Sequence, residues 1–565
     1  MCRAGVVCYR RTTGLATVWM ADGGSERMRT KSLFLAAAGA SLMWAAAAEA
    51  RPKAVPAPDS RDAEIQVLKA EVRALEAKVD ALAARAEQPP APPPPPVAVA
   101  APAPAPPVVQ TPVPASFPTA GGATIVAGKP VIASADGRFS ANIHGLMQLD
   151  AADYSQATPG PIASDFRRGA AAADTAHARD LNSGTDFRRA RLGIDGRAFG
   201  DWDYNLLWEF GGAGEEDAAH VYELWIQYSG LKPFHLKIGA FAPAGGLEDQ
   251  GSASGSLFLE RPAAADIARN LAGGDTREGA QLWAAGERWF ASGAVTGRTV
   301  GVIGSTGSAI SQPFDSQLGF VGRVAFLPIV TGNLIVEAGL HGSYVDRPAD
   351  AGGPDTAVGT ARFPITLQER PELRVDATRL ISTGGINARH ADDIGLELSG
   401  RVGPLFLQSE YETLHIQRLG PAAGAGDPTF HGGYLEGGLM LTGERRRFNN
   451  ATFAWDGPPV NHPFSPADHT WGAFEAVLRY SEINLNYHAG AAGTAPGADA
   501  VRGGDQQIWT GGLNWYPNSF AKFMLDYQDV RIDRLSPSAA TFQTPNGAQI
   551  GQHYHVVELR SQFAF

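Results

Sequence analysis

The sequence predicts an all-β protein, an antiparallel transmembrane β-barrel of about sixteen strands, preceded by a short coiled-coil helix and a proline-rich linker. Three observations predict this class. Polar and apolar residues alternate over segments of about ten residues from residue 136 to the C-terminus. Short and long connections separate these segments, as they do on the two sides of a membrane barrel. The apolar faces are rich in Trp, Tyr and Phe near the ends of the segments, as the interfacial girdles of a membrane barrel require.

Composition narrows the function classes. The 565 residues carry a formal net charge of −11, which argues against nucleic acid as the main partner. Both cysteines, Cys2 and Cys8, lie at the N-terminal end, so neither a disulfide framework nor a cysteine metal site is expected. Ser561 and His555 would lie about 20 Å apart on one strand, too far for a nucleophile and its base. We therefore expect no enzyme and no cofactor.

The first element is a targeting segment over residues 28–50. Arg29 and Lys31 precede an apolar run that ends in the small-x-small pattern Ala48-Glu49-Ala50, which is typical of a cleaved signal peptide. A short membrane anchor is the alternative, and the short apolar run disfavours it. Residues 1–27 then form an upstream extension from a misassigned start.

The second element is a coiled coil over residues 59–88. Its apolar residues alternate spacings of three and four, which places them on one seam of a helix. They are Ile65, Leu68, Val72, Leu75, Val79 and Leu82. A single amphipathic helix packed on another surface is the alternative. Residues 89–135 follow as a Pro/Ala-rich linker that contains Pro92 to Pro96 and favours an extended spacer.

The third element is the barrel over residues 136–565. One segment sets Arg189, Arg191 and Arg197 on a polar face, opposite Leu192 and Ile194. The last segment carries an apolar face of Val557, Leu559, Phe563 and Phe565. A soluble β-sandwich also alternates, but aromatic residues near the segment ends and the unequal connections favour a membrane barrel. The long connections are 151–185, 242–277, 346–390 and 532–551.

Several motifs in this region also occur in a known family. They are Phe187–Gly193 continuing through Gly200–Tyr204, Ile238–Phe241 with Pro243–Glu248 and Phe258–Arg261, Leu441–Glu444, and Trp471–Ser481. In this order they resemble the phosphate-selective porin family, the O and P type outer-membrane porins, and the terminal Phe565 fits as well. The resemblance implies a sixteen-stranded trimeric channel in the bacterial outer membrane. It also implies that the third long loop, here about 242–277, folds inward and narrows the pore.

Arginines in the lumen would suit an anion channel, because lumen charges replace the water around a permeating ion and the guanidinium fork matches oxyanions. Alternation puts three strand arginines in the lumen and Arg188 on the opposite face, next to Phe187. The loop 242–277 adds three more. The predicted anion-pathway residues are Arg189, Arg191, Arg197, Arg261, Arg269 and Arg277.

Each of these arginines has an alternative structural role, because lumen arginines often pair with acids and hold a loop in place. The acids that could pair with them are Asp195, Glu209, Glu260, Asp266 and Glu278. The loop 242–277 also has no lysine and five acidic residues, Glu248, Asp249, Glu260, Asp266 and Asp275. The passage of anions in general is therefore better supported than selectivity for phosphate.

Two further groups of residues invite a functional interpretation. Arg445-Arg446-Arg447 could attract anions or contact lipopolysaccharide phosphate, but a solvated charge run is the favoured interpretation. His553 and His555 share the apolar face at the start of the last segment. With no third ligand nearby in sequence, a metal site is not expected there.

Two functions remain open. The leading hypothesis is a passive porin for small anions in the bacterial outer membrane, with phosphate and polyphosphate as candidate permeants. Its expected partners are outer-membrane lipid, lipopolysaccharide and two further copies of the chain in a homotrimer. The alternative is a structural protein whose periplasmic coiled coil and linker tether the membrane to the cell wall, and both roles could coexist.

Overall fold

The structure is a computed structural model in which eight stretches of the chain are described. These are residues 122–126, 129–156, 181–211, 220–273, 276–300, 317–349, 364–537 and 546–565. The predicted extension (1–27), signal peptide (28–50), coiled coil (59–88) and most of the linker (89–135) lie outside the described residues. They stay predictions.

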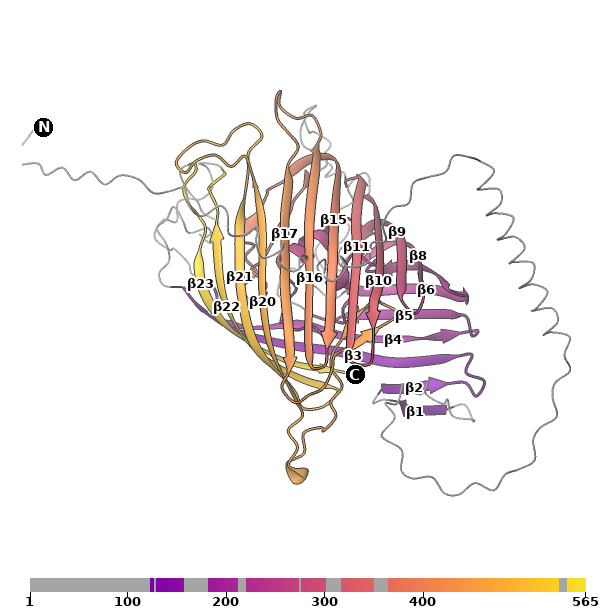
Figure 1. Cartoon of the computed structure of the whole chain (residues 1–565). Helices are drawn as coiled ribbons and strands as arrows, with labels where there is room; N and C mark the ends of the chain where they lie inside the picture. The colour runs from indigo at the N-terminus through magenta and orange to yellow at the C-terminus, as the bar shows by residue number, and fades with distance from the viewer. Residues whose placement is uncertain are drawn as a thin grey trace, which may run out of the picture. The chain divides into compact units, whose positions relative to one another are not determined.

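Sixteen long antiparallel strands of the described chain close into one barrel, which confirms the barrel part of the predicted fold (Figure 1). The last strand pairs with the first of the sixteen, so no edge is left open. The strands are β3 (Ser140–Ser155), β4 (Gly184–Ala198), β5 (Trp202–Glu209), β6 (His220–Leu231), β7 (Phe234–Phe241), β8 (Arg277–Ala285), β9 (Trp289–Thr299), β10 (Leu318–Val330), β11 (Leu334–Arg347), β15 (Ile386–Val402), β16 (Leu405–Arg418), β17 (Thr429–Met440), β20 (Ala473–Tyr487), β21 (Val501–Tyr516), β22 (Ala521–Asp533) and β23 (His553–Ala564).

A short hairpin precedes the barrel. It consists of β1 (Gly122–Val126) and β2 (Lys129–Ala133), and β2 pairs with the start of β3. Thr124, Ile125 and Val131 are β-branched residues of the kind that favour strands. The segment predicted as linker over 89–135 therefore ends in two strands that extend the sheet.

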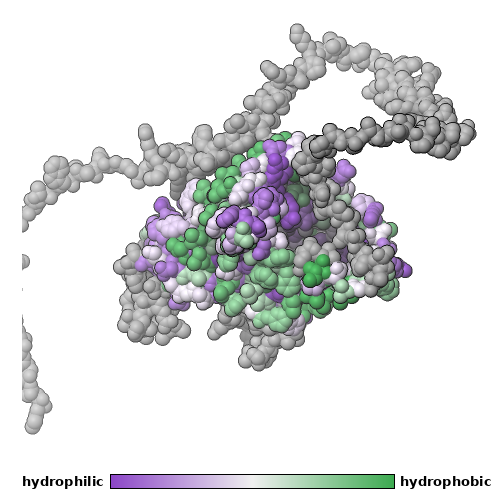
Figure 2. All heavy atoms as spheres, turned by 90° about the horizontal axis from the view of Figure 1, so that it is seen from below, coloured by the Kyte–Doolittle hydropathy of each residue, from purple (hydrophilic) through white to green (hydrophobic). Residues whose placement is uncertain are grey.

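The outer face of the barrel is apolar, as alternation requires of strands that face lipid. Along β23, Val557, Leu559 and Phe563 are each about half exposed, whereas Glu558 and Arg560 between them are buried toward the lumen. Figure 2 shows broad apolar areas on the flank of the barrel. None of the described helices is long and apolar enough to span a membrane.

The third long connection folds into the barrel, as the family resemblance implied. It carries α3 (Leu247–Gln250) and α4 (Ala263–Ala272). We call residues 242–276 the constriction loop, of which 274 and 275 are outside the described residues. Nine of the ten residues of α4 are buried, because the helix lies among the lumen side chains of the surrounding strands. The loop therefore fills part of the lumen.

A second connection, between β11 and β15, also folds inward, which the sequence did not indicate. Its described part begins with β12 (Pro364–Ile365), β13 (Gln368–Glu369) and β14 (Ile381–Ser382). We call residues 364–385 the second inward loop. Leu373 and Leu380 belong to the same buried apolar cluster as Ile267 and Leu271 of α4. The two loops thus pack on each other inside the barrel.

A third insertion enters from the end of the barrel that carries the short turns. It joins β17 to β20 through β18 (Arg447–Asn449), β19 (Ala454–Asp456) and η2 (Pro466–Asp468), and it projects below the barrel in Figure 1. Phe453 and Trp455 are buried, and the Trp455 ring packs edge-on against Phe406 of β16 at 5.1 Å. This connection anchors itself in the lumen by aromatic packing.

The closing seam gives a first testable prediction. Gly145 of β3 exchanges two backbone hydrogen bonds of 3.1 Å with Phe565, and a Cβ on Gly145 would lie 2.7 Å from the Phe565 ring. We expect Gly145→Val to displace the terminal aromatic residue and lower the folded yield, measured by heat-modifiable migration in gel electrophoresis. Gly293→Val is the control, because no heavy atom lies within 4 Å of a Cβ there. Equal yields for the two variants would contradict the prediction.

Candidate ion pathway

The constriction loop is held by side chains of the barrel strands and of the third insertion, which donate to its backbone carbonyls. Arg446 donates to Gly255 at 2.7 Å and Asn514 donates to Leu257 at 2.8 Å. Three more donors act in the same way, namely Lys522 on Ser256, Arg560 on Leu259 and Arg479 on Glu260. Irregular backbone inside a barrel needs such partners, because its carbonyls would otherwise be buried unpaired. Much of the lumen's positive charge therefore positions the loop.

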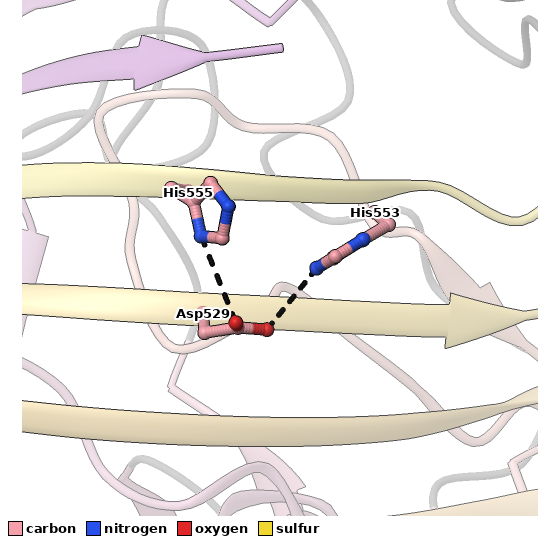
Figure 3. A group of neighbouring side chains, drawn as sticks. All are labelled: Asp529, His553 and His555. Atoms are coloured by element: carbon pink, nitrogen blue, oxygen red, sulfur yellow. Dashed lines mark hydrogen bonds and ion pairs between the residues drawn. The ribbon is translucent and has the colours of Figure 1, made fainter. Parts of the chain in front are cut away.

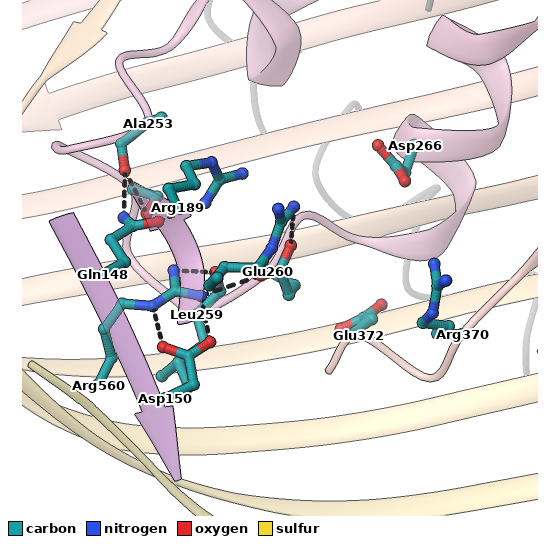
Figure 4. Close-up of polar contacts among 12 residues, drawn as sticks. Gln148, Asp150, Arg189, Ala253, Leu259, Glu260, Asp266, Arg370, Glu372 and Arg560 are labelled. Carbon is teal, nitrogen blue, oxygen red and sulfur yellow. Dashed lines mark hydrogen bonds and ion pairs between the residues drawn. The ribbon is translucent and has the colours of Figure 1, made fainter. Parts of the chain in front are cut away.

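A compact ion-pair cluster lies where the constriction loop meets β3, β4 and β23 (Figure 4). Glu260 accepts from Arg188 at 2.5 Å and from Arg560 at 2.9 Å, while Arg560 also makes a two-pronged pair with Asp150 at 2.6 Å. Burial opposes the ionisation of Glu260, but the guanidinium groups of Arg188, Arg189 and Arg560 outweigh it. They hold the pKa of this carboxyl well below its usual range.

The prediction that Arg188 faces away from the lumen is wrong. Gln148 of β3 pairs with Arg189, but the next residue, Leu149, pairs with Phe187, so Arg188 is an extra residue in β4. Such a β-bulge puts two consecutive side chains on one side of a strand. Arg188 and Arg189 consequently both point inward and are 7% and 6% exposed. Strict alternation could not reveal this.

Arg189 differs from its neighbours because no carboxylate binds it directly. Its Nη1 donates to the neutral Gln148 at 2.6 Å, and its Nε is buried without a hydrogen-bond partner among the described residues. The guanidinium thus keeps an unused donor in the lumen, and its charge has no carboxylate in direct contact.

Two small cavities share Arg189 as a wall. We call the first the arginine cavity. It measures about 50 Å³ and is lined by Arg188, Arg189, Arg191 and Arg374, with Glu209 as its carboxylate. The second measures about 30 Å³ and lies against the constriction loop, where Arg261 is another of its lining residues. Three carboxylates, Glu248, Glu260 and Glu436, also line this second cavity, so the positive charge is concentrated at the arginine cavity.

The other strand arginines of the predicted pathway have acidic partners. Arg191 donates to Glu209 at 2.6 Å and lies over the Tyr222 ring, although it also lines the arginine cavity. Arg197 is half exposed and pairs with Asp203 of β5 at 3.0 Å, near a short turn. The structure therefore brings Arg191 close to Arg189 and leaves Arg197 apart.

The three predicted arginines of the loop 242–277 differ in whether their guanidinium groups have partners. Arg269 is buried and pairs with Asp249 at 2.5 Å and Asp266 at 3.5 Å. Arg277 donates to the carbonyls of Gly273 and Asn270, which end α4. The Nε of Arg261 is buried without a hydrogen-bond partner among the described residues. The structural alternative therefore describes Arg269 and Arg277, whereas Arg189 and Arg261 each keep a buried Nε without a hydrogen-bond partner among the described residues.

Several side chains that hold the constriction loop or line its cavities were not among the predicted pathway residues. Alternation along β20, β22 and β23 would have placed Arg479, Lys522 and Arg560 on the lumen face, which is a usable signal. Arg374 lies in the second inward loop, and no sequence pattern indicated that it would enter the lumen. In the arginine run, Arg445 and Arg447 are exposed as expected, but Arg446 is buried and pairs with Glu475 at 2.8 Å.

Glu372 links the two inward loops to the wall and gives a second prediction. Its carboxylate accepts from the Ala263 N–H at 3.0 Å, from Ser481 at 2.5 Å and from Arg479 at 2.5 Å. Removing one partner of a buried ion pair costs about 3–5 kcal/mol. We expect Glu372→Ala to loosen both loops and raise single-channel conductance.

The control for this prediction is Glu287→Ala, which changes an exposed acid in a short turn. Conductance of the Glu372 variant equal to that of the Glu287 variant would contradict the linking role. Thermal unfolding measured in the same detergent would show whether the barrel itself stays folded.

A closed barrel with an inward-folded loop and a charged lumen is the architecture of an outer-membrane porin. The chain belongs to the phosphate-selective porin O and P family, whose model matches residues 159–565.

Two relatives and one solved structure are similar to this chain. The chain is 25% identical to Porin O of Pseudomonas aeruginosa over 423 residues, which cover 72% of this chain and 86% of the relative. It is 26% identical to an uncharacterized protein of Caulobacter vibrioides, with coverage of 78% and 76%. An anion-selective porin from Comamonas acidovorans matches in structure with a TM-score of 0.43 at 15% identity, covering 76% of this chain and all of that one, 100%.

Proposed function

We propose that this porin is a passive diffusion channel for small anions, and that Arg189 is the side chain that attracts them at the constriction. The observation that carries the proposal is the environment of Arg189. Its guanidinium is buried, faces a neutral partner and keeps one donor unused between two cavities. Because this positive group is already shielded from water, a permeating anion can approach it at little cost in desolvation free energy.

Small oxyanions such as phosphate and polyphosphate are candidate permeants within this proposal. Family membership and the relative named Porin O support them. The grouping of Arg188, Arg189 and Arg191 also suits oxyanions, because guanidinium groups donate in pairs to neighbouring oxygens. The constriction loop has no lysine, so any preference for phosphate would depend on these arginines.

Assembly and location complete the proposal. We infer a homotrimer in the outer membrane, a cleaved signal peptide over 28–50 and a periplasmic coiled coil over 59–88. Cross-linking of the full chain in membranes would test the trimer, and removal of residues 59–118 would test whether the coiled coil tethers the cell wall.

The test of anion passage is the reversal potential of single channels in planar bilayers under a salt gradient. We expect the current to reverse near the chloride potential in potassium chloride. Potassium phosphate on one side and potassium chloride on the other would then rank the two anions. A reversal potential on the potassium side, or no conductance, would reject the proposal.

A further inference from the structure

Three titratable side chains meet on the outer face of the barrel, away from the ion pathway (Figure 3). His553 and His555 lie two residues apart on β23, and Asp529 is the residue of β22 directly opposite His555. The Nε2 of His553 lies 3.2 Å from one Asp529 oxygen, and the Nδ1 of His555 lies 3.8 Å from the other. We call these three residues the rim cluster.

The rim cluster supplies the third ligand that the sequence lacked. Two histidines spaced by one residue put both rings on one face of a strand, but Asp529 lies 24 positions before His553 and reaches them only through the strand register. No metal site was expected here because the sequence near the two histidines offers no third ligand. The register of β22 against β23 brings Asp529 to them, so that reason no longer holds.

The geometry is close to that of a metal site. The three ligand atoms lie within 4.8 Å of one another. Zinc binds nitrogen and oxygen at about 2.0–2.2 Å, which separates neighbouring ligand atoms by about 3.3 Å in a tetrahedron. Small side-chain rotations would therefore bring all three onto one ion and leave the fourth position to water.

The hydrogen bonding of His555 also points to an unmet partner. Its Nδ1 is shielded from solvent and has no hydrogen-bond partner among the described residues, while Tyr527 stacks on its ring at 5.7 Å. The 3.8 Å gap to Asp529 is too long for a hydrogen bond and short enough for a bridging ion.

One neighbour opposes a cation. The Nε of Arg531 lies 3.3 Å from the Asp529 carboxylate, and its side chain is 65% exposed. Because that side chain reaches into solvent, it can turn away when a doubly charged ion takes its place. Arg531 should therefore weaken metal binding without blocking it.

We propose that the rim cluster binds a divalent transition-metal ion of the zinc, nickel or copper class. Two imidazoles and one carboxylate select these ions over magnesium or calcium. The bound ion joins β22 to β23, the strand that also closes the barrel against β3. An ion that binds only the folded barrel then stabilises the folded state.

The test is a zinc titration of the full-length chain without a polyhistidine tag, folded in detergent micelles and stripped with a chelator, followed by calorimetry. We expect one tight zinc per chain. His553→Ala and His555→Ala should each weaken it at least tenfold, and Arg531→Gln should tighten it.

His415→Ala is the matched control. His415 of β16 pairs with Asp392 at 3.1 Å on a strand face shared with the exposed Tyr411, but this pair has one histidine instead of two. Its loss should leave the tight zinc unchanged.

The double variant His553→Ala/His555→Ala separates the rim cluster from a second group in the barrel. That group is buried and consists of His341 with Asp393 and Glu412. Zinc that persists at full stoichiometry in the double variant would belong there and would overturn the proposal. Wild-type zinc affinity no higher than that of the double variant would overturn it as well.

Discussion

Replacing Arg189 by glutamine is expected to lower the chloride-over-potassium permeability ratio about fivefold. Two unit charges 4 Å apart interact by about 1 kcal/mol even in a water-like medium, which corresponds to that factor. The effect should be large because the Arg189 charge has no directly bound carboxylate to cancel it. Reversal potentials in a potassium chloride gradient measure the ratio directly.

The substitution should leave the fold intact. The direct hydrogen-bond partner of Arg189 is the neutral Gln148, and Glu260 keeps its ion pairs with Arg188 and Arg560. Arg197→Gln is the matched control, because Arg197 belongs to the same strand but is half exposed and paired with Asp203. An equal change of the ratio in both variants would show that the selectivity depends on overall charge instead of on Arg189.

The barrel could be predicted from the sequence because alternation is a local property of each strand. Val557, Leu559 and Phe563 alternate with buried polar residues whatever the neighbouring strand contributes. The sixteen-strand count followed from alternation and from family resemblance, and the inward fold of the constriction loop was implied by the resemblance alone.

The site could be predicted only in part because its chemistry depends on register and on loops. Arg188 is an extra residue of β4 that has no partner on β3. This bulge changes which side chains of β4 enter the lumen. The second inward loop brings Glu372 to Arg479 across 107 positions of sequence, for which no local pattern exists. The partner of His553 and His555 was hidden for the same reason.

Replacing Glu260 by glutamine should have the opposite effect to the Arg189 substitution and raise the chloride-over-potassium ratio about fivefold. The substitution removes the negative charge that Arg188 and Arg560 share, so the lumen gains one net positive charge at the constriction. Arg560 keeps its pair with Asp150, and glutamine keeps one acceptor oxygen. The expected loss of stability is therefore about 3 kcal/mol, the lower end of the cost of removing one partner of a buried ion pair.

The matched control is Glu278→Gln. Glu278 is half exposed, pairs with Arg298 at 3.3 Å and shares the face of β8 that carries the exposed Leu282. The ratio of this variant should equal that of the wild type. A Glu260 variant with an unchanged or lowered ratio would exclude this carboxylate from the ion pathway.

The pH dependence of the wild type provides an independent check on the charge of Glu260. Its pKa in the folded barrel lies well below the usual range, while an unfolded glutamate titrates near about 4.3. A depressed folded pKa means that the stabilisation is complete above the unfolded value and disappears only as pH falls through the folded one. Selectivity and unfolding temperature should therefore show no step from Glu260 between pH 7 and 5. The contrary result would be a step in selectivity or unfolding temperature between pH 7 and 5 in the wild type that is absent from the Glu260→Gln variant. Such a step would show that the Glu260 carboxyl takes up a proton in that interval and that the arginines do not hold it ionised.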